Sequence, residues 1–131
     1  MKYTKDEIVA FRLQKAESDL QDAKTLAEVK GWDGVINRLY YAAFHSVSAL
    51  LEYNEIKHRS HSGAKAMLEL HYVKTRKLDI GWGDFYTNLF EDRHDSDYED
   101  FVVFTEEEVA PLIPQAEEFI KVIEALIRTE L

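Results

Sequence analysis

One short segment of this sequence gathers most of the side chains that could do chemistry. Seven of the ten residues from Glu91 to Asp100 are acidic or basic, and the segment also holds a histidine and a tyrosine. Arg93 could bind a phosphate through two parallel hydrogen bonds. His94 could transfer protons near neutral pH. The segment therefore predicts a site for a phosphate-bearing ligand, and metal-independent cleavage of RNA is the reaction that such groups suit.

Several other classes of site lack the residues that they need. The sequence has no cysteine, so it holds neither a disulfide nor a thiol nucleophile. It contains no glycine-rich phosphate loop and no nucleophile elbow. His58 and His61 stand three residues apart, and no carboxylate follows at the spacing of a metal ligand. We therefore expect no metal and no cofactor.

Charge is divided unevenly along the chain. The net charge of −9 argues against general attraction to nucleic acid or to an anionic membrane. Residues 1–78 carry 13 Lys and Arg against 10 Asp and Glu, whereas residues 79–131 carry 3 against 15. Basic residues concentrate between Lys57 and Lys77. A local patch that faces phosphate is compatible with the acidic total, and the alternative is a solvated helix face followed by a basic loop.

Length and hydrophobic content indicate one folded unit. A chain of 131 residues fits a single domain with its own core, and 46% hydrophobic residues argue against disorder. The N-terminal region has no apolar run of the kind found in a signal peptide or a membrane span. The sequence therefore predicts one domain over residues 1–131, cytoplasmic and not associated with a membrane.

The first helix is expected over about residues 5–30. Thr4 and Glu7 have the spacing of a capping box at its start, and apolar residues recur at helical spacing up to Gly31. The opposite face of this helix, which includes Asp19, is interpreted as solvated and without evident chemistry.

A second helix, expected over about 33–54 with Asp33 as its cap, has an apolar arc broad enough for a central element. Another side of it carries polar residues at steps of three and four. An aromatic, an arginine and a histidine in register make this ridge the best partner for the segment around Arg93. The alternative is a solvated face with snorkelling side chains. The ridge consists of Arg38, Tyr41, His45, Ser48 and Glu52.

A third helix is expected to run to about Val73, with Ser60 or Ser62 as its cap. His61 falls in its first turn. A histidine there can form a hydrogen bond near the cap, and the positive end of a helix also suits an anion.

A fourth helix, expected over about 79–96, places Arg93 on its apolar stripe. A guanidinium on such a face needs an acidic or phosphate partner, because burying it unpaired is costly. The arginine is therefore either paired within the fold or held for an interface. The stripe consists of Trp82, Phe85, Tyr86, Leu89 and Arg93.

The last helical segment begins with a second capping box, formed by Thr105 and Glu108. Pro111 lies beyond the first turn, so we expect a kink or a break around 110–114 before the last regular helix. Together the elements predict an all-α protein, an antiparallel four-helix up-and-down bundle with an additional short helix.

Three segments occur in a recognisable order: Arg38 to His45, His61 to Gly63, and Phe90 to Arg93 followed by Asp97 and Tyr98. Together they resemble the HEPN domain family, and the resemblance covers almost the whole chain. It implies an all-α bundle that forms a homodimer with the two arginine segments close together. Many members are RNases, often toxins paired with a small nucleotidyltransferase antitoxin, and others are non-catalytic nucleotide- or RNA-binding modules.

The sequence departs from the RNase members of that family at one position. Those members carry a histidine with four to six residues between it and the arginine, whereas Tyr98, Glu99 and Asp100 stand here. His94 directly follows Arg93, and on a helix it points about 100° away from it. The segment resembles the Asp-Tyr branch of the family, and Tyr98 matches in position a tyrosine that the partner nucleotidyltransferase modifies in some toxins.

Three functional hypotheses follow. The first is a homodimeric module that binds a nucleotide or RNA phosphate, working with a nucleotidyltransferase in a toxin-antitoxin or defence setting. The second is a metal-independent endoribonuclease, with Arg93 and His94 as catalytic residues or with His45 or His61 in the role of the missing histidine. The third is a structural module whose ion pairs fix an oligomer. The predicted nucleotide- or RNA-binding residues are Arg93, Asp97, Tyr98, Arg38, Tyr41, His45 and His61.

Overall fold

The computed structural model describes residues 2–129, and this part of the chain contains helices and no strand. The prediction of an all-α fold is therefore confirmed. Among these residues, none of the helices combines the length and the hydrophobicity of a membrane span. The α-helices are α1 (Lys5–Glu28), α2 (Trp32–Tyr53), α3 (His61–Leu68), α4 (Ile80–Tyr98), α5 (Glu106–Val109) and α6 (Leu112–Thr129), and a π-helix, η1 (Glu69–Val73), directly follows α3.

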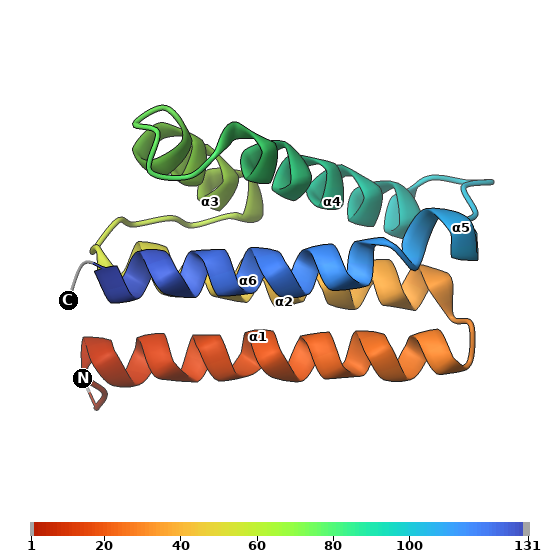
Figure 1. Cartoon of the computed structure of the whole chain (residues 1–131), viewed down its shortest axis with the longest axis horizontal. Helices are drawn as coiled ribbons and strands as arrows, with labels where there is room; N and C mark the ends of the chain where they lie inside the picture. The colour runs from red at the N-terminus through yellow and green to blue at the C-terminus, as the bar shows by residue number, and fades with distance from the viewer. Residues whose placement is uncertain (1, 130–131) are drawn as a thin grey trace.

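The four long helices form an up-and-down bundle. In Figure 1, α1, α2, α4 and α6 run in alternating directions, with α1 at the bottom, α4 at the top and α6 drawn in front of α2. The helix α3 lies beside the start of α4, and the short α5 leads into α6. Because α2 packs against all five other α-helices of the described residues, it is the central helix of the bundle.

Both predicted capping boxes are present. At the start of α1, the Glu7 amide donates to the Thr4 hydroxyl at 3.1 Å, and the Glu7 carboxylate accepts from the Thr4 amide at 2.9 Å. At the start of α5, the Thr105 amide donates to the Glu108 carboxylate at 3.0 Å, and the Thr105 hydroxyl accepts from the Glu108 amide at 3.4 Å. These bonds satisfy amides that the helix itself leaves without acceptors.

One predicted helix boundary differs from the structure and another agrees with it. Asp33 was expected to cap the second helix, but α2 begins one residue earlier, at Trp32, and no side chain caps it. The tight turn through Gly31, whose amide donates to the Leu26 carbonyl at 3.0 Å, brings the chain into α2 before Asp33. The expected break at Pro111 is confirmed, since this residue lies between α5 and α6.

Aromatic rings form the centre of the core beneath the region that carries Arg93. Tyr40 on α2, Tyr86 on α4 and Phe119 on α6 are all fully buried. The rings of Tyr86 and Phe119 are nearly parallel, with centroids 5.7 Å apart, and the ring of Tyr40 lies 6.0 Å from that of Tyr86. Ring contacts of this kind hold α2 against α4. They therefore also fix the relative positions of the side chains that the two helices carry around Arg93.

Candidate functional site

Arg93 reaches inward from α4 and lies on aromatic rings. Its side chain is 11% exposed. The guanidinium carbon stands 5.1 Å from the centroid of the Tyr40 ring, 5.8 Å from that of Tyr41 and 5.9 Å from that of Tyr98. Such contacts attract a cation through the negative face of each ring. The sequence prediction that this arginine shares the inward face of its helix agrees with the structure.

The hydrogen bonds of Arg93 leave much of its guanidinium unused. Its Nη1 donates to Asp97 Oδ2 at 3.5 Å, a long contact between residues one helical turn apart. Its Nε is buried and has no hydrogen-bond partner within residues 2–129. A guanidinium carries five N–H donors, so this one retains the capacity to bind an oxyanion.

Asp97 connects α4 to the polar ridge of α2 through Asn37. The Asn37 amide donates to Asp97 Oδ2 at 3.4 Å, and its oxygen accepts from Arg38 Nε at 3.1 Å and Nη2 at 2.9 Å. Asn37 is not among the site residues predicted from the sequence. A signal for it exists, because Asn37 stands four residues before Tyr41 and so continues the same ridge.

A buried carboxylate from α1 joins two residues of that ridge. Asp19 is only 8% exposed. Its Oδ1 accepts from Arg38 Nη1 at 2.9 Å, and its Oδ2 lies 2.9 Å from His45 Nδ1. The interpretation of Asp19 as solvated is therefore wrong. Because Asp19 lies three residues after Ala16 and four before Ala23, both buried, it belongs to the inner stripe of α1.

His61 enters the same region from the first turn of α3. Its Nδ1 and the Tyr40 hydroxyl share a hydrogen bond of 2.8 Å, and its ring lies 4.3 Å from that of Phe44. Burial lowers the pKa of His61, and the charges of Arg93, His45 and, further, His58 lower it more. Burial also raises the pKa of Tyr40 to about 12. The pair is therefore neutral near pH 7, and His61 adds no charge to repel Arg93.

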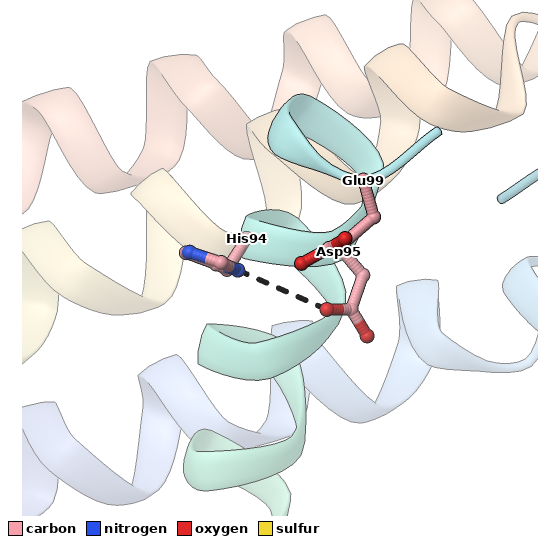
Figure 2. Close-up of side chains that lie close together, drawn as sticks. All are labelled: His94, Asp95 and Glu99. Atoms are coloured by element: carbon pink, nitrogen blue, oxygen red, sulfur yellow. Dashed lines mark ion pairs between the residues drawn. The ribbon is translucent and has the colours of Figure 1, made fainter. Parts of the chain in front are cut away.

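His94 and its neighbours occupy the exposed side of the same helix end. The His94 side chain is 54% exposed and its ring stands 5.1 Å from that of Tyr98. Figure 2 shows His94 beside Asp95 and Glu99. One potential ligand atom from each of the three side chains lies within 4.8 Å of the others. His94 and Glu99 are exposed, and exposed acidic groups commonly lie together without holding an ion. His94 therefore lies apart from the polar side chains described above around Arg93.

The ring of Tyr41 contacts four of the other predicted site residues, so these residues form one continuous surface. It lies 5.1 Å from the Arg38 guanidinium, 5.8 Å from that of Arg93, 6.2 Å from the His45 ring and 5.6 Å from the His61 ring. Of the predicted site residues, only His94 turns away, and Tyr98 borders the rest. We call this surface the arginine strip. It consists of Asp19, Asn37, Arg38, Tyr41, His45, His61, Arg93 and Asp97.

Comparison with known proteins gives consistent matches over most of the chain. The family model of the HEPN domain matches residues 9–126. A UPF0332 protein of Thermotoga maritima is 39% identical over 123 residues, which cover 94% of this chain and 93% of that protein. Two proteins of Methanocaldococcus jannaschii, each bearing the name "Putative toxin", are similar as well. One is 34% identical over 88% of this chain and 85% of its own length, the other 29% identical over 82% and 74%.

Proposed function

The chain belongs to the HEPN domain family, and from that premise we propose that it is a homodimeric module that binds a phosphate group of a nucleotide or RNA through Arg93. The relatives named as toxins support a role in a toxin-antitoxin or defence setting. A small nucleotidyltransferase is the partner that we propose, with Tyr98, which is 67% exposed, as the residue that it modifies.

The unused hydrogen-bonding capacity of Arg93 carries this proposal. Its guanidinium rests on tyrosine rings with one long contact to a carboxylate and with its Nε buried and unpaired within residues 2–129. A buried cation with unmet donors costs free energy. Two oxygens of a phosphate would accept hydrogen bonds from the terminal nitrogens and neutralise the charge, while the enclosed Nε stays out of their reach. The binding of a phosphate therefore completes an arrangement that the protein alone leaves incomplete.

The other residues of the arginine strip have supporting roles in the proposal. Arg38 supplies a second cation across the Tyr41 ring, although Asp19 balances its charge. The exposed ring of Tyr98 offers a face on which a base can stack. Asp97 holds Arg93 and contacts Asn37, so it orients the arginine relative to α2.

Titration with labelled single-stranded RNA and with ATP tests the phosphate site. We expect Arg93→Gln to weaken binding by about 10-fold or more, since hydrogen bonds to a charged group contribute roughly 1.5–3 kcal/mol. The matched control is Arg128→Gln, because Arg128 is exposed on α6 and pairs with Glu124. Equal binding by the wild-type protein and by Arg93→Gln contradicts the proposal. If that variant loses stability or dissociates while ligand binding stays the same, the structural hypothesis is favoured instead.

The homodimer is tested separately by analytical ultracentrifugation. A sedimenting mass twice that of the chain at micromolar concentration is the expected result. A monomer mass throughout removes this part of the proposal and leaves the phosphate site to be judged by the titrations.

One observation favours a second candidate, a metal-independent endoribonuclease. His45 Nδ1 lies 2.9 Å from Asp19 Oδ2. An ionised carboxylate only accepts hydrogen bonds, so Nδ1 carries the proton and Nε2 is the nitrogen that can take one from a 2′-hydroxyl. A base oriented by a carboxylate is a recurrent catalytic arrangement. In this second function His45 takes the role of the catalytic histidine that is absent from positions 98–100.

Incubation with single-stranded and structured RNA in EDTA tests this second function. Cleavage that is lost in both Arg93→Gln and His45→Gln supports it. His61→Gln distinguishes which imidazole acts, because His61 also faces the strip. An absence of cleavage by the wild-type protein rejects the endoribonuclease and leaves the binding proposal intact.

A further inference from the structure

We propose that a groove beside the arginine strip binds the bases of single-stranded RNA whose neighbouring phosphate is held by Arg93. The groove lies between the first half of α1, the second half of α2 and the segment that leads through Arg59 to His61 at the start of α3. This inference rests on the proposed function, because Arg93 fixes where along the groove the RNA backbone enters.

The size and lining of the groove fit nucleotides. Its volume is about 990 Å³, at the upper end of the range for ligand pockets. Phe44 of α2 contributes to its wall. Tyr3 and Phe11 also line it, and they are 64% and 61% exposed although both are large aromatic side chains. Exposed rings beside a wall of this kind are the surfaces on which unpaired bases stack.

The charge of the groove is opposite to that of the chain as a whole. Arg12, Lys15 and Arg59 line it, against a single carboxylate, that of Glu7. Arg12 is balanced by Glu52 at 3.1 Å, which leaves Lys15 and Arg59 as the cations that face a ligand. On a protein with a net charge of −9, a groove that is locally positive selects an anionic ligand.

The groove and the arginine strip share two residues. His45 and His61 line the groove, and both rings contact Tyr41, whose own ring lies 5.8 Å from the Arg93 guanidinium. A strand held at Arg93 can therefore continue past the two histidines into the groove. Only unpaired bases can reach the rings that line it, so the ligand is single-stranded rather than duplex RNA.

The test compares two ligands that differ only in their bases: a single-stranded RNA pentanucleotide and a ribose-phosphate pentamer without bases. Phe11→Ala should weaken the pentanucleotide by about 5-fold or more, equivalent to ~1 kcal/mol for one stacked base, and leave the abasic pentamer unchanged. Arg93→Gln should weaken both. Arg59→Gln should reduce the slope of log affinity against log salt concentration by about 0.7.

Matched controls come from outside the groove. Phe101→Ala removes a fully exposed phenylalanine from the segment between α4 and α5, at the end of the bundle opposite the start of α1 (Figure 1). Arg128→Gln removes an exposed arginine from α6. Neither control should change the affinity for the pentanucleotide. Thermal unfolding of each variant verifies that the fold is intact.

The outcomes separate this inference from the proposed function. If Arg93→Gln loses affinity for the pentanucleotide while Phe11→Ala and Arg59→Gln do not, the groove is overturned and the phosphate site stands. If the groove variants lose affinity and Arg93→Gln does not, the groove is supported and the phosphate site is overturned. If a hexaglutamate peptide binds more tightly than the pentanucleotide and its binding depends on Phe11, the groove serves an acidic protein and the RNA proposal fails.

Discussion

At the scale of residues, Asp19 is the junction of the arginine strip. Each of its carboxylate oxygens holds a different α2 side chain, Arg38 and His45, at 2.9 Å. Removing the charge of the Asp19 carboxylate takes away the charged partner of both Arg38 and His45. This happens at a largely buried position. We expect Asp19→Asn to lower the free energy of unfolding by about 1–3 kcal/mol, measured by urea denaturation.

The control for that substitution lies on the same helix. Asp22 is exposed on α1, and Asp22→Asn should change the unfolding free energy by less than about 0.5 kcal/mol. Equal losses in the two variants would mean that the helix, and not the junction, is responsible.

His61 makes stability depend on pH in a defined direction. Burial first, and then Arg93 and His45, lower its pKa in the folded protein below 6.5. Between that lowered pKa and 6.5 the unfolded chain binds the proton more readily, so the folded state loses stability as the pH falls through this window. We expect urea denaturation between pH 5 and 7.5 to show this decline, and His61→Gln to reduce it. An unchanged slope in that variant would assign the pH dependence to another group.

The sequence predicted some residues of the site and missed others. Tyr41, His45 and Arg93 were predicted because helical spacing alone places them on a shared ridge or stripe. Asp19 was missed because its contacts join residues 19 and 26 positions apart, across two helices, and a single helix pattern does not show which polar residue a neighbour will bury. His94 was selected for its chemistry, but its position on the helix turns it outward.

At the scale of elements, the capping residues set the helix starts. Thr4→Ala removes the hydroxyl that accepts from the Glu7 amide, and should cost about 0.5–2 kcal/mol of unfolding free energy. Thr25 is exposed on the same helix, and Thr25→Ala should instead be neutral or stabilise by a few tenths of a kcal/mol, because Ala is the better helix former. Urea denaturation of both variants should thus show effects of different sign or size; equal losses would contradict the role of the cap.

Sequence patterns predicted the helices better than their irregularities. The four long helices follow from apolar periodicity and from cap and break signals that act within a few residues. The last turn of the expected third helix is π-helical over Glu69–Val73. Tyr72 in this segment is buried. Its hydroxyl accepts a hydrogen bond of 2.6 Å from the side-chain amide of Asn54. Such tertiary contacts are not visible in a local pattern.

At the scale of the whole molecule, acidic residues crowd one side of α4. Glu91, Asp92 and Asp95 line a cavity of about 430 Å³ together with Glu108 of α5. Burial, and then the charges of Asp95 and Glu108, raise the pKa of Asp92. The folded state therefore binds this proton more tightly than the unfolded chain, and the cost of ionising Asp92 appears as the pH rises through the raised pKa.

Neutralising that position should stabilise the protein. We expect Asp92→Asn to raise the unfolding free energy at pH 7 by about 0.5 kcal/mol, the size of a relieved like-charge pair on a helix. The gain should shrink as the pH is lowered toward 4, because the raised pKa of Asp92 means that its carboxyl is protonated at a higher pH than that of an ordinary Asp. Asp84→Asn, at an exposed position of the same helix, should give no gain at either pH. Thermal and urea unfolding at both pH values provide the comparison.

The pairing of α1 with α2 also determines the order in which the molecule assembles. These two helices are consecutive in the sequence and have the most extensive contact in the bundle. Contacts between near neighbours in the chain close small loops, so we expect this hairpin to be formed in the folding transition state. Leu20→Ala in α1 should then slow folding, whereas Ile123→Ala in α6 should mainly accelerate unfolding, as chevron plots would show. Asp19 and His45 would meet early, and Arg93 would reach Tyr41 only when α4 docks.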